Sequence, residues 1–153
     1  SRANALLGRD NAASMFATVF YGVLDLRDGA LDYCNCGHNA PVLIGADGVC
    51  RRLAAGGLPL AVCEDSPVTG QRISLAKGDR LLMFTDGLSE ALDLANEEFG
   101  EARLLESVQR HSASPADALL PQLFADVDAF TLEAPQADDM TCVTLAWCAD
   151  EVC

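Results

Sequence analysis

Three aspartates lie directly against the ends of apolar segments. Asp86 follows the apolar run 81–84 after a single threonine, and Asp138 and Asp139 come just before the last apolar run of the chain. A carboxylate next to a protein core is costly unless it is paired or coordinated, and few basic residues are near enough in sequence to pair with these. Gly87 permits a sharp turn and the close approach of a ligand. The pattern favours a site for a hard divalent cation, although Asp-Gly and Asp-Asp pairs are also common in ordinary turns and loops.

Other titratable residues favour structural roles. His38 lies in a loop after a predicted strand, where a general acid that titrates near neutral pH is one interpretation and a hydrogen-bonded structural histidine is the one we favour. Glu90 suits either water-mediated support of the metal site or, as we prefer, the N-terminus of a helix, where negative charge is favourable. A solvated face is expected for the acidic residues Glu97, Glu98 and Glu101.

The seven cysteines form no recognisable framework. Their number is odd, no Cys-x-x-Cys pair occurs, and no histidine stands at zinc-site spacing. Reduced cysteines of a cytosolic protein are the simplest interpretation. Cys34 and Cys36 fall two apart on a predicted strand and share a face, so we expect small buried apolar side chains there and assign them no chemistry.

Composition limits the classes of partner. The 153 residues suffice for one domain with a substantial core, and 23 acidic against 10 basic residues give a net charge of -13. No Lys or Arg follows Arg110. Nucleic acids and anionic membranes are therefore poor partners, because both are polyanions that require basic patches. No apolar run approaches the roughly 20 residues of a membrane-spanning helix, and no signal peptide is evident, which predicts a soluble, cytoplasmic protein.

The apolar pattern predicts an antiparallel sheet followed by helices and a returning strand. Asp-Gly pairs at 28–29 and 47–48 predict hairpin turns. Ser114 before Pro115 is typical of a helix start, and Pro121 predicts a kink or a late start in that helix. We expect strands at 15–25, 30–35, 42–44, 49–53, 68–75, 80–85 and 140–147, a loop at 56–62, and helices within 1–13, around 104–108 and at 119–130. This order indicates an α+β layered fold with helices packed on a sheet face.

Five segments form an ordered set of motifs along the chain: 15–25 (MFATVFYGVLD), 33–41 (YCNCGHNAP), 57–60 (GLPL), 78–91 (GDRLLMFTDGLSEA) and 138–141 (DDMT). Together they resemble the motifs of the SpoIIE-like branch of the metal-dependent type 2C (PPM) protein serine/threonine phosphatases. Each motif is weak alone, but five in the right order across nearly the whole chain are strong.

The resemblance implies a layered antiparallel β-sandwich flanked by helices, with Mg²⁺ or Mn²⁺ at its end in a two-metal site. It implies that Asp86 and Asp138 are metal ligands essential to catalysis, with Asp139 a neighbouring metal-site residue. The implied reaction is hydrolysis of phosphoserine or phosphothreonine on a regulatory protein by a metal-activated water. A phosphorylated anti-sigma-factor antagonist is the kind of substrate implied, with a sensory domain upstream in the parent protein.

One motif of the family has no counterpart in this sequence. The family's domain opens with Gly-Asp-Val-x-Gly-x-Gly, whose aspartate bridges both cations, and no segment matches it. We therefore expect residues 1–153 to be about the C-terminal two-thirds of a single phosphatase domain that is incomplete at its N-terminus. We also expect weak metal binding and little activity from this chain alone.

Two functions of other classes stay open as alternatives. A non-catalytic module with a phosphatase fold could bind a regulatory protein, in which case no metal site would depend on Asp86 and Asp138. An acidic calcium-binding domain ranks last, because the sequence has no alternating Asp-x-Asp-x-Asp-Gly loop.

Overall fold

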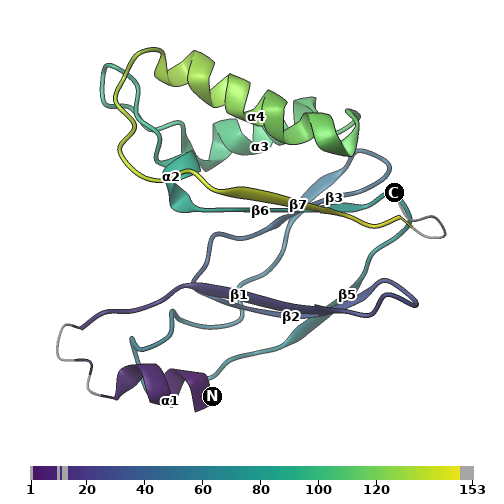
Figure 1. Cartoon of the computed structure of the whole chain (residues 1–153). Coiled ribbons are helices and arrows are strands. Elements are labelled where there is room, and N and C mark those ends of the chain that lie inside the picture. Colours follow the sequence, from purple (N-terminus) through teal and green to yellow (C-terminus); the bar gives the residue numbers. More distant parts are fainter. Residues whose placement is uncertain (1, 10, 12–13, 149–153) are drawn as a thin grey trace. The chain divides into compact units, whose positions relative to one another are not determined.

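Seven strands and four helices are present in the computed structural model, which describes residues 2–9, 11 and 14–148. They belong to two units that interleave along the chain. Residues 1–40 and 53–75 make up the first unit, and residues 41–52 and 76–153 make up the second. Each unit contains one antiparallel sheet (Figure 1).

The sheet of the first unit has the strand order β1-β2-β5. Its strands are β1 (Val19–Leu24), β2 (Ala30–Cys36) and β5 (Gln71–Ser74). Gly29 turns the chain between β1 and β2 with a φ of 72°, which glycine adopts without steric cost. The hairpin predicted from Asp28-Gly29 is therefore confirmed.

Helix α1 (Arg2–Gly8) is anchored in this unit through a buried polar side chain. The Asn4 amide nitrogen donates to the carbonyl oxygens of Cys63 and Glu64, both at 2.8 Å, and its Oδ1 accepts from the Ala61 N–H at 2.8 Å. Asn4 is only 1% exposed, whereas Leu6 and Leu7 are 55% and 50% exposed. The side chain that fixes this helix is therefore an amide, not one of its leucines.

The sheet of the second unit has the order β4-β3-β6-β7. Its strands are β3 (Val42–Ile44), β4 (Cys50–Arg52), β6 (Arg80–Phe84) and β7 (Cys142–Ala146), and its helices are α2 (Asp86–Ser89), α3 (Gly100–Arg110) and α4 (Ala116–Thr131). Gly48, with a φ of 81°, makes the second predicted hairpin turn, between β3 and β4. Helices α3 and α4 cover one face of this sheet (Figure 1).

The core of the second unit lies between that sheet face and the two helices. Its fully buried members alternate along the strands and recur at helical spacing, as burial of one face requires. They include Val42, Ile44, Leu82, Leu88, Leu104, Val108, Leu119, Leu123 and Val127. Leu43 and Leu81, on the other face of the sheet, are also at most 2% exposed. The strand before Asp86 is therefore buried on both faces, as its continuous apolar run suggests.

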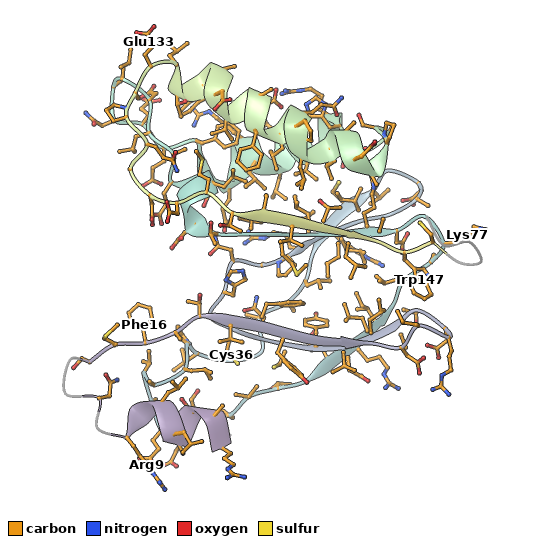
Figure 2. The ribbon with its side chains drawn as sticks, in the orientation of Figure 1. Arg9, Phe16, Cys36, Lys77, Glu133 and Trp147 are labelled. Carbon is orange, nitrogen blue, oxygen red and sulfur yellow. The ribbon has the colours of Figure 1, made fainter. Side chains whose placement is uncertain are left out.

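Asp79 and Arg80 brace the turns at one end of this sheet. The Asp79 carboxylate, 6% exposed, accepts the Ala46 N–H at 3.0 Å and the Ala76 N–H at 2.8 Å, so it joins two turns. Buried Arg80 donates to the carbonyl oxygens of Ser112 and Ser114. Figure 2 shows Trp147 at the same end, and its carbonyl oxygen accepts the Gly78 N–H at 2.9 Å. The segment Gly78-Asp79-Arg80 thus holds these turns together by hydrogen bonds.

Helix α4 begins differently from the prediction. Pro115 is its N-cap and makes no side-chain capping bond, while the Ser114 carbonyl is occupied by Arg80. The helix starts at Ala116 and runs through Pro121 to Thr131, so the expected late start at Pro121 is wrong. Burial of Leu119 and Leu123 against the core stabilises the helix on both sides of the proline, at the cost of one internal hydrogen bond.

The short helix α2 was not expected from the sequence, and it corrects the role of Glu90. Glu90 is the C-cap of α2, where its N–H donates to the Asp86 carbonyl oxygen, so the preferred N-terminal position for this residue is wrong. The side chain of Glu90 is exposed. Its charge therefore lies at the less favourable end of the helix dipole.

The α+β class predicted from the sequence is confirmed, and the strands and the two long helices lie where the apolar pattern placed them. The expectation that residues 1–153 form about two-thirds of a single phosphatase domain stays a prediction, as does the packing of the sheets as a sandwich. None of the described helices combines the length and apolar character needed to cross a membrane.

Candidate metal site

Asp86 stands where strand β6 passes into helix α2. Thr85 is the N-cap residue with extended backbone angles, and Asp86 is the first residue of the helix. The Asp86 Oδ1 accepts the Gly87 N–H at 3.1 Å, and the side chain is exposed. The strand thus presents this carboxylate at the edge of the core, next to buried Gly87, Leu88 and Ser89.

Asp138 and Asp139 approach this point from the segment that leads into β7. A Cβ atom at Gly87 would lie 2.5 Å from the Asp139 carbonyl oxygen and 3.4 Å from the Asp138 carbonyl carbon. No real side chain tolerates such contacts with backbone atoms. Glycine at position 87 is therefore what lets the backbones of the two acidic segments lie against each other. The joint role of Asp86, Asp138 and Asp139 as metal ligands stays a prediction.

Thr85 links the same two segments by hydrogen bonds. Its Oγ1 donates to the Asp139 carbonyl oxygen at 3.2 Å and accepts the Thr141 N–H at 3.0 Å. The Thr85 N–H also donates to the Thr141 carbonyl oxygen at 3.0 Å, which extends the pairing of β6 and β7 up to the aspartates. The hydroxyl thereby fixes the position of residues 139–141 relative to Asp86.

The carboxylates of Asp86, Asp138 and Asp139 each have at least one oxygen without a hydrogen-bond partner in the described part of the chain. The Asp138 Oδ1 accepts the Asp139 N–H at 2.7 Å, and the Asp138 carbonyl oxygen accepts from the Gln136 amide at 2.7 Å. Within the described part of the chain, Oδ2 of Asp86, Oδ2 of Asp138 and the carboxylate of Asp139 have no hydrogen bond or ion pair. All three side chains are exposed, so these oxygens are open to a ligand.

The donor set fits a hard divalent cation in type and falls short of a complete ligand set. Carboxylate and carbonyl oxygens are the ligands that Mg²⁺ prefers, with waters filling its remaining positions. Among residues 2–9, 11 and 14–148, however, no group of three or more His, Cys, Asp or Glu side chains is arranged to hold a metal ion. The residues present therefore suit one side of a metal site.

His38 lies in a hydrogen-bonded loop, and the structural role that we favour for its ring stays a prediction. Its N–H donates to Asn35 Oδ1 and its carbonyl oxygen accepts from Asn35 Nδ2, both at 2.9 Å, while its ring Nδ1 lies 3.4 Å from Thr18 Oγ1. Gly37, with a φ of 75°, packs so closely on Pro59 that an added Cβ would lie 2.3 Å from the ring. The second and third sequence motifs are therefore one packed loop pair in the first unit.

The described cysteines form no disulfide, and burial lowers the reactivity of two of them. All six, Cys34, Cys36, Cys50, Cys63, Cys142 and Cys148, are outside disulfides; Cys153 lies outside the described residues. Burial, and then the neighbouring Cys34 thiol, raise the pKa of the Cys36 thiol, and burial raises the pKa of Cys142 to about 11. Thiols with raised pKa values are poor nucleophiles.

The acidic residues before and within α3 are solvated, as predicted, and two of them form ion pairs. Both Arg52 guanidinium nitrogens pair with the Glu101 carboxylate, at 2.6 Å and 2.9 Å, and Arg103 lies 3.8 Å from Glu97. These carboxylates are at the surface and belong to salt bridges, so they are not part of the metal site.

Thr85 and Thr141 are the site residues that the sequence interpretation missed. Both stand in motifs noted for their aspartates, but neither was given a role. The available signal was the position of the two threonines. Thr85 stands between the end of β6 and Asp86-Gly87, and Thr141 stands between the Asp138–Asp139 pair and the start of β7. Only the register that places Phe84 opposite Cys142 shows that the two threonines meet.

Comparison with known proteins identifies the relatives. A family model described as Stage II sporulation protein E (SpoIIE) matches residues 1–147. Protein IcfG of Synechocystis sp. is 29% identical over 135 residues, which is 86% of this chain and 21% of the relative. The phosphoserine phosphatase RsbU of Bacillus subtilis is 25% identical over 122 residues, 79% of this chain and 36% of that protein. The chain thus spans about a fifth to a third of the length of these relatives.

Solved structures share the fold. The RsbU and RsbW domains of Rv1364c from Mycobacterium tuberculosis align with a TM-score of 0.73 and 25% identity, over 97% of this chain and 41% of that one. The phosphatase domain of SpoIIE from Bacillus subtilis, presoaked with manganese, aligns with a TM-score of 0.70 and 18% identity over 97% of this chain and 65% of that one. The second likeness concerns the fold alone.

Proposed function

This chain belongs to the SpoIIE family, and from that membership we propose that it carries one side of the metal site of a protein serine/threonine phosphatase. The observation that supports this most is the contact of the Asp86 and Asp138–Asp139 segments across Gly87. The exposed carboxylates of these two segments are of the type that Mg²⁺ or Mn²⁺ prefers. An acidic surface alone would repel a phosphate group, and bound cations would reverse that field.

The proposed roles of the chain's residues rest on the family motifs, and the contacts between the two segments support them. Asp86 and Asp138 would hold the cation and Asp139 would support it, while Gly87 and Thr85 keep the two segments against each other. A divalent cation bound there supplies an activated water and offsets the charge on the phosphoryl oxygens. Because no described group of three acidic side chains surrounds the site, we expect weak metal binding, with a Kd of about 0.1–1 mM.

The substrate that we propose is a phosphoserine or phosphothreonine on a regulatory protein. RsbU is itself named a phosphoserine phosphatase, and Rv1364c carries RsbU and RsbW domains in one chain. An anti-sigma-factor antagonist is the specific substrate proposed, and a sensory domain elsewhere in the parent protein would control the site.

Calorimetric titration with Mn²⁺ tests the metal site directly. We expect weak binding to the 153-residue chain, and loss of that binding in Asp86→Asn and Asp138→Asn. Asp117→Asn is the matched control, because it removes one carboxylate from an exposed position in the first turn of α4, in the same unit. Equal binding by all four proteins would show that the carboxylates do not form the site.

Hydrolysis of an aryl phosphate in the presence of Mn²⁺ tests the expected activity. We expect little turnover from this chain alone. Robust turnover that Asp86→Ala abolishes would contradict that expectation and would show that the described ligands suffice.

A non-catalytic interaction module is the second candidate. The incomplete ligand set favours it, because a phosphatase fold without a full metal site can still bind a regulatory protein. Such a module would bind its partner equally well in Mn²⁺ and in a chelator, and Asp86→Asn would not change that binding.

A further inference from the structure

A pocket lies beside the candidate metal site, within the second unit. Its volume is about 190 Å³, and its walls come from α2 and the residues after it, from the end of α4 and from the segment that leads to the acidic pair. Gly87, Leu92, Asp128, Leu132, Pro135 and Met140 are among the lining residues. Gly87 follows Asp86 directly, and Met140 follows Asp139 directly, so the pocket adjoins both acidic segments.

The size of the pocket limits what it can bind. At about 30 Å³ per water molecule, the volume corresponds to roughly six waters. Pockets for small molecules and cofactors generally start at about 300 Å³. A single extended side chain is therefore a better match for this pocket than a whole cofactor.

The lining combines an apolar wall with one carboxylate. Leu92, Pro135 and Met140 supply apolar surface, and Asp128 supplies the charge. Asp128 is exposed, and its carbonyl oxygen accepts from the Leu132 N–H and the Thr131 hydroxyl. Within the described part of the chain its carboxylate has no hydrogen bond or ion pair. The carboxylate is thus available to a cation that enters the pocket.

The surroundings add negative charge without compensating positive charge. Glu133, labelled in Figure 2, follows Leu132 on the segment after α4, and no Lys or Arg occurs after residue 110. Arg103 lies over the Phe130 ring and pairs with Glu97, and Arg110 pairs with Asp126. Both basic side chains of α3 are therefore engaged elsewhere, which leaves Asp128 to a positively charged ligand.

Leu132 forms its part of the wall in a strained conformation. Its backbone has a φ of 56° and a ψ of -117°, which a leucine rarely adopts, and its side chain is 68% exposed. Backbone strain of this kind persists only where the surrounding structure holds it, and it clusters at functional positions. The wall is thus held in place by the surrounding structure and is not a relaxed loop.

We propose that this pocket binds a Lys or Arg side chain of the protein substrate, close in sequence to the phosphorylated residue. This proposal rests on the proposed function. Long basic side chains match the pocket because their alkyl stems pack on apolar surface while their charged heads pair with carboxylates. The stem would lie against Leu92, Pro135 and Met140, and the head would pair with Asp128.

Peptide binding to the 153-residue chain tests the proposal. Fluorescently labelled phosphoserine peptides that carry one Lys at successive flanking positions are compared with the same peptides carrying norleucine or Glu there. Anisotropy is measured in Mn²⁺, with unphosphorylated versions of each peptide in parallel. Asp128→Asn is compared with Asp117→Asn, which makes the same change at the opposite end of the same helix.

We expect the best Lys peptide to bind about threefold to fivefold more tightly than its norleucine partner, as an exposed ion pair allows. Asp128→Asn should abolish this ratio, Asp117→Asn should keep it, and about 0.5 M NaCl should reduce it. Equal affinities for Lys and norleucine, tighter binding of norleucine, or an unchanged ratio in Asp128→Asn would overturn the proposal.

The failures of the two proposals are distinguishable. If metal binding depends on Asp86 and Asp138 while the preference for Lys peptides is missing, the proposed metal site is supported and the proposed binding of a basic side chain in the pocket is refuted. If unphosphorylated Lys peptides show the preference and no metal binds, the pocket is supported as a docking site for basic side chains and the proposed phosphatase function is refuted.

Discussion

Gly87 is the residue on which the geometry of the acidic site depends most. Its missing side chain leaves room for the Asp139 carbonyl oxygen, which would lie 2.5 Å from a Cβ atom. The obstructing atom is backbone, so it cannot rotate away as a side chain could. Any larger residue must therefore push the 138–139 segment away from Asp86.

We predict that Gly87→Ala lowers the free energy of unfolding by about 2–3 kcal/mol and weakens Mn²⁺ binding. Urea unfolding and calorimetric titration measure the two effects. Gly8→Ala is the matched control, because a Cβ at Gly8 meets nothing within 4 Å and alanine is the better helix former. An unfolding midpoint for Gly87→Ala equal to that of Gly8→Ala would refute this account.

Residue types and the order of the motifs pointed to the three aspartates as candidate metal ligands. They did not predict the contacts between the segments that carry them. Asp86 and the Asp138–Asp139 pair could be placed at strand ends from apolar runs alone. The hydrogen bonds of Thr85 and the close approach at Gly87 depend on strand register between segments more than 50 residues apart. Register over such a separation is set by packing, which no local pattern specifies.

At the scale of elements, Asp126 joins the two long helices of the second unit. Its Oδ2 accepts from Ser107 at 2.5 Å, Arg110 at 2.9 Å and His111 at 3.0 Å, so one α4 carboxylate binds the C-terminal end of α3 and the residue after it. The Ser107 hydrogen bond, with smaller contributions from His111 and Arg110, lowers the pKa of Asp126, and burial opposes this shift.

The lowered pKa predicts a pH-dependent cost for Asp126→Asn. A carboxyl whose pKa is lower folded than unfolded adds stability above its unfolded pKa of about 3.9, and this is lost as the pH falls through the folded pKa. We expect the variant to lose about 1–2 kcal/mol at pH 7 and clearly less near pH 3. Urea unfolding at both pH values measures this, with Asp117→Asn as the control. A loss that is equal at both pH values would show that the charge is not what stabilises the helix pair.

The elements themselves were largely predictable, and the errors have physical causes. The Asp-Gly turns at 28–29 and 47–48 fixed two hairpins, because glycine is needed for the positive φ found there. Helix α4 passes Pro121 because burial outweighs one lost hydrogen bond. The four-residue helix α2 carries too few residues for a periodic pattern, so Glu90 was assigned to the wrong end of a helix.

At the scale of the whole chain, negative charge is concentrated in one unit. Residues 41–52 and 76–153 hold 17 acidic and 6 basic residues, a net charge of -11, against 6 acidic and 4 basic residues, a net charge of -2, in the first unit. Repulsion among like charges opposes folding, and dissolved salt screens it. The stability of the second unit should therefore depend more on ionic strength than that of the first.

We predict that raising NaCl from about 0.02 M to about 0.3 M increases the Tm of the chain by about 2–4 °C, because screening then outweighs the loss of surface ion pairs. Differential scanning calorimetry measures the change. Arg52→Gln removes the Arg52–Glu101 ion pair and raises the net negative charge, so its Tm should rise more steeply with salt. A Tm that falls with salt would mean that ion pairs dominate over repulsion.

The interleaving of the two units also governs the order in which the chain can fold during synthesis. The first sheet is complete in sequence once β5 has emerged at Ser74, whereas β6, ending at Phe84, lacks its partner β7 until residues 142–146 have been made. Nearly sixty residues, including both long helices, are translated in that interval. Throughout it the edge of β6 that pairs with β7 has no partner strand in the chain, and such an unpaired edge favours pairing with other chains.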